Sequence, residues 1–249
     1  MCSSYFLAPH VHLCVAGKHV VLLDLEQDKY LVFAQTHSIG QLVQGWPAIP
    51  GTQRMVAGQE TTHAPTEAAL SVAEQRILGK LLARRILVTD PVVGKVAKLV
   101  VTDEVKMALV EPQLLERPDA TFGHFWRLLW AYWVAKWALR RRSIKEVVEG
   151  VRARKIQASA AAEPLNVDTV RTLVAAFLFL RPIFYTAHNA CVLDSFTLTR
   201  FLALYGIFPD WVFGVKPEPF HAHCWVQQGG CVFNDSPDLV REFSPILAV

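Results

Sequence analysis

Residues 191–215 read CVLDSFTLTRFLALYGIFPDWVFGV, and this stretch decides the fold class. Apolar side chains recur at helical spacing as far as Tyr205, and an alternating, strand-like pattern begins at Trp211. Two more alternating runs, 222–227 and 231–233, meet at a Gly-Gly pair that is typical of a tight hairpin turn. Because helices precede a short run of antiparallel strands, the second half of the chain is predicted to be α+β.

Upstream, the chain between residues 124 and 142 is its most aromatic part and is predicted to be a helix. One face of it carries four tryptophans at spacings of four, three and four: Trp126, Trp130, Trp133 and Trp137. The favoured interpretation is an amphipathic helix that packs this face on the body of the domain. The alternatives are docking to a membrane surface or to a partner helix.

A basic stretch ends this helix at Arg140-Arg141-Arg142 and continues through Arg152, Arg154 and Lys155. Cations suit the C-terminal end of a helix, so we interpret the stretch as a solvated face. The alternative is a site for a phosphate-bearing ligand.

Length and composition exclude several classes of protein. The 249 residues are 52% hydrophobic, which is enough to fill a sizeable core, and 25 Lys and Arg against 22 Asp and Glu leave a net charge of only +3. So small a positive charge argues against a dedicated nucleic-acid binder. The N-terminus lacks the basic and apolar segments of a secretory signal, and the longest apolar run, Leu173 to Leu180, is too short to span a bilayer. We therefore expect a cytoplasmic protein without stable membrane insertion, whose five cysteines are free thiols.

The first ninety residues predict a small sheet with helices. Three short strand-like runs form a meander: 11–15, 20–23 and 30–33. A helix over 39–44 and a second over 66–85 flank an aperiodic loop over 47–65. Residues 92–115 mix β-branched residues with turns and receive no assignment. The chain is therefore divided into a domain over 1–90, a linker over 91–120 and a domain over 121–249.

Three residues have the order and placement of a Cys-His-Asp triad. Cys191 lies in the first turn of a predicted helix, where the field of the helix N-terminus lowers the pKa of a thiol and the backbone N–H groups can stabilise an oxyanion. His223 lies in a later strand, and Asp235 follows the hairpin turn, where it can orient the imidazole. His221 is the rival for the base.

A zinc site is the rival for the whole cluster, and its ligands would come from Cys191, His221, His223, Cys224 and Cys231. It is disfavoured because alternation places Cys224 on the strand face opposite the two histidines, and because the sequence holds no Cys-x-x-Cys pair. We predict no metal.

The segment 191–207, followed by Trp211-Val-Phe-Gly-Val, Pro219-Phe-His-Ala-His-Cys-Trp-Val and Asn234-Asp235, resembles the lasso-peptide B proteins. These are leader peptidases of the transglutaminase-like cysteine-protease group. The resemblance covers about residues 120–249 and implies that Cys191 is the nucleophile, His223 the general base and Asp235 the orienting acid. Cys224 departs from the alanine expected between the histidine and the tryptophan, and Val192-Leu193-Asp194 is an unusual sequel to the cysteine.

The N-terminal segments 20–33 and 77–87 are similar to the PqqD-like recognition element for ribosomally made precursor peptides. The resemblance implies a winged-helix-like module of three strands with helices, which binds a leader peptide as an added strand along its third strand and beside its last helix. Here those elements are 29–33 and 68–85. The residues assigned to peptide binding are Tyr30, Leu31, Val32, Phe33 and Leu81. Without the resemblance, Tyr30, Val32 and Leu81 would be interpreted as core residues.

Together the two resemblances imply a fused protein in which residues 1–90 hold the leader of a lasso-peptide precursor and residues 121–249 cut it. The implied partner is an asparagine-synthetase-like cyclase that uses ATP. Cleavage coupled to ATP is implied as well, but the sequence holds no glycine-rich phosphate loop, so no cofactor is assigned to this chain and ATP is assigned to the partner. The alternatives are a transglutaminase-type acyl transferase and a non-catalytic leader-binding scaffold.

Overall fold

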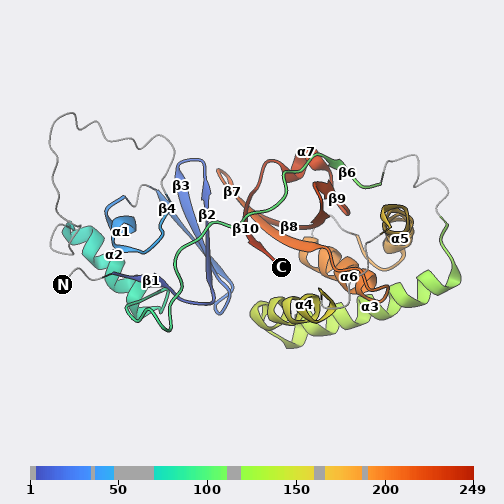
Figure 1. Cartoon of the computed structure of the whole chain (residues 1–249), viewed down its shortest axis with the longest axis horizontal. Helices are drawn as coiled ribbons and strands as arrows, with labels where there is room; N and C mark the ends of the chain where they lie inside the picture. The colour runs from blue at the N-terminus through green and yellow to red at the C-terminus, as the bar shows by residue number, and fades with distance from the viewer. Residues whose placement is uncertain (1–3, 35–36, 48–69, 111–118, 160–165, 187–189) are drawn as a thin grey trace. The chain divides into compact units, whose positions relative to one another are not determined.

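The computed structural model describes residues 4–34, 37–47, 70–110, 119–159, 166–186 and 190–249. It divides into two compact units (Figure 1). The first comprises Met1–Val100 and Pro217–Phe220, and the second comprises Val101–Lys216 and His221–Val249. The stretch expected as a linker over 91–120 is thus divided at Val100 between the two units.

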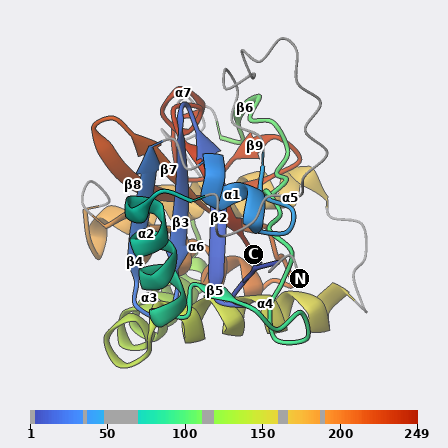
Figure 2. The same cartoon turned by 90° about the vertical axis from the view of Figure 1, so that its left-hand side faces the viewer.

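The first unit is built on the expected three-stranded sheet, which Figure 2 shows. Its strands are β2 (Val11–Ala16), β3 (His19–Asp24) and β4 (Lys29–Ala34), paired antiparallel in that order. The turn between β2 and β3 contains Gly17 at φ +58°, a left-handed conformation that glycine adopts without strain. The predicted meander is therefore confirmed.

Two helices and a second small sheet complete this unit. Helix α1 (His37–Leu42) follows β4, and α2 (Val72–Ala83) begins directly after Ser71. Ser71 and Glu74 form a reciprocal capping box, which explains why the helix starts at Val72 rather than earlier. The predicted residues 66–69 of this helix and the predicted loop over 48–65 lie outside the described residues. Strand β1 (Phe6–Leu7) pairs with β5 (Leu87–Val88), a pairing that local patterns do not predict.

The second unit contains a five-stranded sheet in the order β10-β7-β8-β9-β6. The central strands are β7 (Asp210–Pro217) and β8 (Phe220–Gln228), as the alternating runs predict. The flanking strands are β6 (Met107–Ala108), β9 (Cys231–Val232) and β10 (Ser244–Ala248). The sheet is not purely antiparallel as expected, because β6 pairs parallel with β9.

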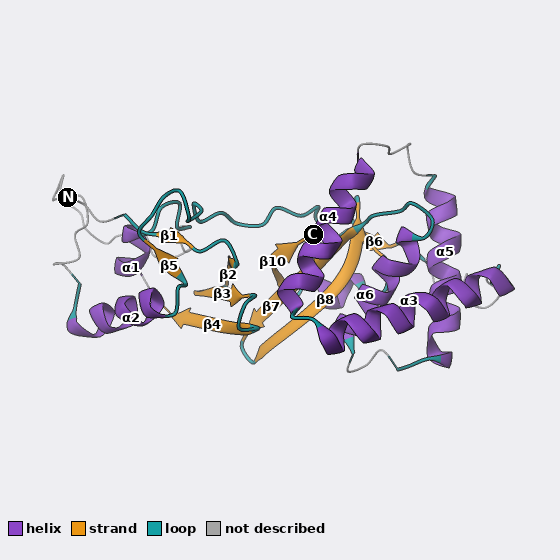
Figure 3. Cartoon of the chain, turned by 90° about the horizontal axis from the view of Figure 1, so that it is seen from below, coloured by secondary structure: helices purple, strands orange, loops and turns teal. Residues whose placement is uncertain are grey.

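The second unit also contains helices, one of which packs directly on this sheet. They are α3 (Phe122–Arg141), α4 (Ile144–Ser159), α5 (Val167–Leu180), α6 (Cys191–Ala203) and α7 (Pro237–Val240), with a 3-10 turn η3 (Arg181–Ile183). Helix α6 packs on β7, where the rings of Phe196 and Trp211 stack with centroids 5.2 Å apart. Helix α3 packs along α6 (Figure 3). Within the described residues, no helix combines the length and the apolarity needed to cross a bilayer.

The tryptophan face of α3 is exposed, whereas the favoured interpretation predicts that it packs on the body of the domain. Its buried face carries small and aliphatic side chains together with one tyrosine: Leu128, Ala131, Tyr132, Ala135 and Ala138. The four tryptophans at 126, 130, 133 and 137 are between 48% and 57% exposed. The prediction that they pack on the body of the domain is therefore wrong, because the three alanines allow α3 to approach its neighbours closely and leave the bulky face outward.

Candidate active site

Cys191 is the first residue of α6, as the sequence predicts. Ala190 is the N-cap residue, and its carbonyl accepts from the Asp194 N–H at 2.8 Å. The N–H groups of the first helical turn have no acceptor within the helix, and they give its N-terminus a partial positive charge. The Cys191 sulfur, which is half-buried, thus stands where a negative charge is favoured.

The imidazole of His223 and the carboxylate of Asp235 are hydrogen-bonded. Nε2 of His223 lies 2.5 Å from Oδ2 of Asp235, and both side chains are mostly buried, at 13% and 20% exposure. The other carboxylate oxygen of Asp235 accepts from the backbone N–H of Ser236 at 2.8 Å, which fixes the carboxylate plane. His221, the rival for the base, is exposed at the surface, and its ring packs on Phe243.

The pKa values of Cys191 and His223 are shifted in opposite directions. A hydrogen bond from the Cys224 side chain, opposed by burial and assisted by a hydrogen bond and the charge of His223, lowers the pKa of Cys191 to about 4. Burial lowers the pKa of His223, but hydrogen bonds to Asp235 and Cys191 outweigh it and raise that pKa to about 9. Both shifts act in the same sense, because they favour a negative charge on the Cys191 sulfur and a positive charge on the His223 ring, whose Nε2 lies on Asp235.

Cys224 is a part of this site that sequence reasoning did not assign. Its side chain is 1% exposed, and burial followed by the neighbouring Cys191 raises its pKa well above the ordinary value, so it stays a thiol. Its sulfur lies 3.3 Å from Oγ of Ser195, which in turn accepts from the indole N–H of Trp211 at 2.7 Å. The Ser195 hydroxyl donates to the Cys191 carbonyl at 2.6 Å, so this network joins Cys224 to the first turn of α6. A side-chain hydrogen bond with Cys224 is also the largest cause of the lowered pKa of Cys191.

A second unassigned residue, Asp194, explains the unusual sequence after Cys191. This carboxylate is 2% exposed and accepts three hydrogen bonds: from Arg181 Nη1 at 2.9 Å, Tyr185 Oη at 3.0 Å and Asn234 Nδ2 at 2.7 Å. The amide oxygen of Asn234 also accepts from the Val226 N–H at 2.9 Å. The first turn of α6 is thereby tied to β8 and to the residue that precedes Asp235.

The signal for Asp194 is visible in the sequence, because a carboxylate among the apolar residues of a buried helix needs partners. Its partners are not visible, since Arg181 and Asn234 come from separate segments. Burial and the Asp194 carboxylate also raise the pKa of Tyr185, so its hydroxyl remains a donor.

Gly214 explains the Gly-Val pair in β7. A Cβ atom at this position would lie 2.7 Å from two ring carbons of Trp225 and 2.9 Å from Cβ of Phe243. The rings of both residues contact the His223 ring, at centroid distances of 6.2 and 5.2 Å. A glycine is required here because the tryptophan that supports the histidine lies directly over the backbone of β7.

Four of the five residues assigned to peptide binding, Tyr30, Leu31, Val32 and Phe33, occupy two faces of β4, which is an edge strand of its sheet. Leu31 and Phe33 pack on the core of the first unit, whereas Val32 is exposed and the Tyr30 ring lies 5.5 Å from that of Phe220. Leu81 is 5% exposed and belongs to that core. The structure thus places Leu81 and the β4 residues in one unit, but it buries Leu81 among apolar neighbours instead of presenting it at the surface.

The described residues contain no cluster of side chains that could form a metal site. No three His, Cys, Asp or Glu side chains among those residues are arranged to hold a metal ion.

Most of the second unit is similar to a known protein superfamily. Residues 127–248 match the model of the transglutaminase-like superfamily, and they form a transglutaminase-like domain. The Microcin J25-processing protein McjB of Escherichia coli is 37% identical over 59 residues, which are 24% of this chain and 28% of that protein. The match thus spans little more than a quarter of the relative's length. No solved structure matches the chain.

Proposed function

We propose that this protein is a cysteine peptidase that removes the leader from the precursor of a lasso-type peptide. The observation that carries the proposal is the hydrogen-bonded pair of His223 and Asp235 beside a Cys191 thiol of strongly lowered pKa at a helix N-terminus. Similarity to a microcin-processing protein supports the class of substrate.

In the proposed reaction, the Cys191 thiolate attacks the scissile carbonyl carbon, and His223, which holds the proton, donates it to the nitrogen that leaves with the core peptide. The leader stays on the sulfur as a thioester. His223 then takes a proton from water, whose oxygen attacks the thioester, and the leader leaves as a carboxylic acid. Asp235 holds the imidazole so that Nδ1 is the nitrogen available to Cys191.

The tetrahedral intermediates carry a negative charge on oxygen, which the N-terminus of α6 can stabilise. Backbone N–H groups of the first helical turn have no acceptor within the helix, and the sulfur of Cys191 lies in the same turn. The network around Asp194 holds this turn against Asn234 and thus holds the nucleophile near the base. Asp194 and Asn234 are positioning residues in this proposal.

The first unit is proposed to hold the leader along β4. As an edge strand, β4 has one row of backbone N–H and C=O groups that no strand of its sheet pairs, and an extended peptide can add there. Val32, which faces away from the core, is the residue of β4 best placed to contact the peptide. Leu81 belongs to the apolar core on which Leu31 and Phe33 of this strand pack.

The product of this cleavage is a core peptide with a free N-terminal amine. An ATP-dependent cyclase of the asparagine-synthetase type, acting in the cytoplasm together with this protein, is the proposed partner that consumes it. This part of the proposal rests on the resemblance to lasso-peptide B proteins.

The test is mass spectrometry of a lasso-type precursor incubated with the wild type and with Cys191→Ala, with and without the cyclase and ATP. We expect leader and core masses from the wild type and intact precursor from Cys191→Ala, which still binds the leader. Cys231→Ala is the matched control, because this half-buried cysteine lies in β9, outside the polar network of Cys191, and we expect it to cleave normally. Cleavage by Cys191→Ala at the wild-type rate would overturn the proposal and leave a leader-binding scaffold.

Acyl transfer is the second candidate, and the transglutaminase-like domain favours it. In that reaction Cys191 would attack the carboxamide carbon of a glutamine side chain and release ammonia, and an amine instead of water would resolve the resulting thioester. Product mass separates the two reactions, because hydrolysis adds one water across a bond whereas crosslinking to a glutamine side chain loses ammonia.

A further inference from the structure

Three arginines from three helices converge on one region of the second unit, away from Cys191. They are Arg142, the C-cap residue of α3, Arg154 of α4 and Arg200 in the last turn of α6. All three line a small cavity of about 80 Å³. Arg154 and Arg200 also line an adjoining, more open cavity of about 400 Å³.

Two of the three guanidinium groups lie over aromatic rings. Arg142 lies over the ring of Trp137 at 5.5 Å, and Arg200 lies over the ring of Trp130 at 5.4 Å. Stacking occupies the flat face of a guanidinium and leaves its N–H groups, which lie in the plane, for other acceptors. Two tryptophans of the outward face of α3 thus orient two of the three cations.

One buried hydrogen-bond donor at this site has no acceptor among the described residues. The Nε atom of Arg200 is buried and has no hydrogen-bond partner among the described residues. Within the same residues, no ion pair joins Arg142, Arg154 or Arg200 to a carboxylate. A buried donor without an acceptor is costly, and it indicates that a ligand supplies the acceptor.

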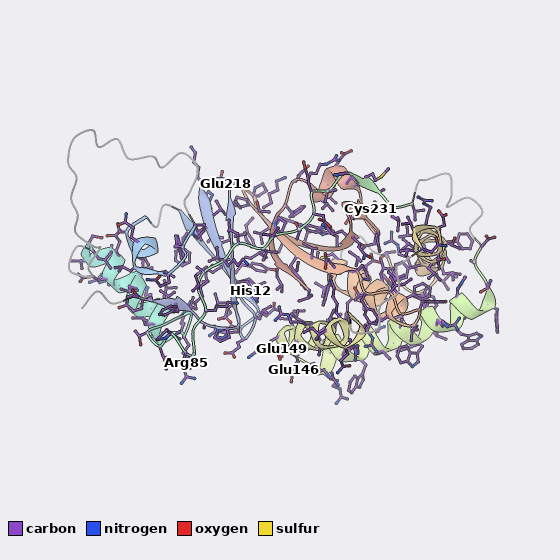
Figure 4. All side chains as sticks on the ribbon, viewed as in Figure 1. His12, Arg85, Glu146, Glu149, Glu218 and Cys231 are labelled. Carbon is purple, nitrogen blue, oxygen red and sulfur yellow. The ribbon has the colours of Figure 1, made fainter. Side chains whose placement is uncertain are left out.

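Glu146 is the only carboxylate among the described residues that line the two cavities, and it accepts hydrogen bonds from Ser143. It accepts from the backbone N–H of Ser143 at 2.8 Å and from the Ser143 hydroxyl at 3.0 Å, at the start of α4, where Figure 4 labels it. The hydrogen bonds from Ser143, opposed by burial and assisted by the charge of Arg142, lower the pKa of Glu146, so Arg142 has some attraction to this carboxylate. The positive charges of Arg154 and Arg142 nevertheless repel that of Arg200. Burial and then the charges of Arg154 and Arg142 lower the pKa of Arg200 to about 10.

We propose that Arg142, Arg154 and Arg200 form a binding site for a phosphate ester. The phosphate would lie in the small cavity, where guanidinium N–H groups from α3, α4 and α6 point to it and accept its charge. The remainder of the ligand would lie in the larger cavity, whose walls include Trp130, Leu204 and Phe208. Such a ligand is either a free phosphate ester or the headgroup of an anionic phospholipid.

This site is independent of the proposed peptidase activity. None of the residues that line the two cavities belongs to the group of Cys191, His223 and Asp235. Cys191→Ala is therefore expected to bind the phosphate ligand as the wild type does, so a failure of one proposal is distinguishable from a failure of the other.

The experiment measures binding to the full chain by calorimetry with pyrophosphate and ATP, and by co-sedimentation with vesicles of phosphatidylglycerol or, as the uncharged comparison, phosphatidylcholine. The variant is Arg154→Gln/Arg200→Gln. Arg152→Gln, an exposed arginine of the same helix as Arg154 that lines neither cavity, is the matched control. Because loss of the half-buried Arg200 can affect folding, the exposed single variant Arg154→Gln is measured too.

Saturable binding of ATP that weakens about tenfold in Arg154→Gln and more in the double variant, with Arg152→Gln unchanged, supports a free phosphate ester; pyrophosphate, which has no organic part, measures the contribution of the phosphate contacts alone. Binding to phosphatidylglycerol vesicles alone, with the same order of variants, supports a phospholipid headgroup. The proposal is overturned if neither class of ligand binds, or if Arg152→Gln weakens binding as much as Arg154→Gln does, since that result indicates a diffuse attraction to positive charge.

Discussion

At the scale of single residues, the shifted pKa values of Cys191 and His223 predict a wide pH range of reactivity. As the pH falls through about 4, Cys191 gains a proton and the thiolate is lost. As the pH rises through about 9, His223 loses the proton that a leaving amine needs. We expect peptide-resolved alkylation of Cys191 by iodoacetamide to be nearly maximal at pH 6, where an ordinary thiol is well under about 1% ionised. Precursor cleavage should fall on both sides of this range.

Cys14 is the internal control for this measurement. Burial raises the pKa of Cys14 to about 12, so it should remain unmodified at pH 6 while Cys191 reacts. A Cys191 that reacts only above about pH 8, as an unperturbed thiol does, would contradict the ion pair.

The role of Cys224 gives a second prediction. Cys224→Ala removes the S–H donor that faces Cys191, and this donor is the largest contribution to the lowered pKa. We therefore expect the acidic limb of the alkylation profile to move to higher pH, with the alkaline limb of cleavage nearly unchanged because Asp235 still faces His223. Cys224→Ser restores an O–H donor and should return the acidic limb toward that of the wild type. An unshifted limb in Cys224→Ala would exclude this hydrogen bond as the cause.

At the scale of elements, the two faces of α3 predict opposite responses to substitution. Leu128 is fully buried, so Leu128→Ala should lower the free energy of unfolding by about 2–5 kcal/mol. Trp133 is 57% exposed, so Trp133→Gln should change it by less than about 1 kcal/mol, although tryptophan is the larger side chain. Urea denaturation of both variants measures the difference. Equal destabilisation would mean that the tryptophan face is covered in solution.

Elements were predictable from sequence where local patterns suffice. The alternation in β2, β3 and β4 and the apolar spacing of α6 are strong local signals, and both predictions are confirmed. Strand β10 could not be predicted, because Pro245 interrupts the alternation and the pairing with β7 shifts register next to it. The parallel pairing of β6 with β9 depends on chain segments far apart in sequence, which no local pattern records.

The orientation of α3 shows the limit of periodicity as a guide. Spacing places the four tryptophans on one face, but it does not decide which face is buried. Hydrophobicity alone favours burial of the tryptophans, whereas packing favours burial of the small side chains of Ala131 and Ala135, which bring two helices closer together.

The candidate site was also only partly predictable from the sequence. The order of Cys191, His223 and Asp235 was readable, but the donor at Cys224 and the partners of Asp194 required the three-dimensional structure.

At the scale of the whole molecule, the two units have separate apolar cores, and this predicts separable effects. Leu22 is fully buried in the core of the first unit. The core around Trp225 in the second unit contains none of the same residues. We expect Leu22→Ala to destabilise the first unit by about 2–5 kcal/mol and to weaken leader binding, while alkylation of Cys191 at pH 6 stays at the wild-type rate.

Hydrogen exchange followed by mass spectrometry checks this prediction. Peptides from β2, β3 and β4 of Leu22→Ala should exchange faster, and peptides from β7 and α6 should keep their protection. If exchange rises throughout and Cys191 reactivity falls with it, the two units unfold as one cooperative body.

The thiolate of Cys191 also has a consequence for the protein's own synthesis. The groups that lower its pKa, Cys224 and His223, lie in β8, which leaves the ribosome after α6. Until β8 has joined the sheet, Cys191 titrates as an ordinary thiol near pH 8.5 and is almost inert toward neighbouring peptides. If Cys191 is the nucleophile proposed above, the nascent chain is protected from premature chemistry, because the reactive form of the sulfur exists only once β8 has folded beside α6.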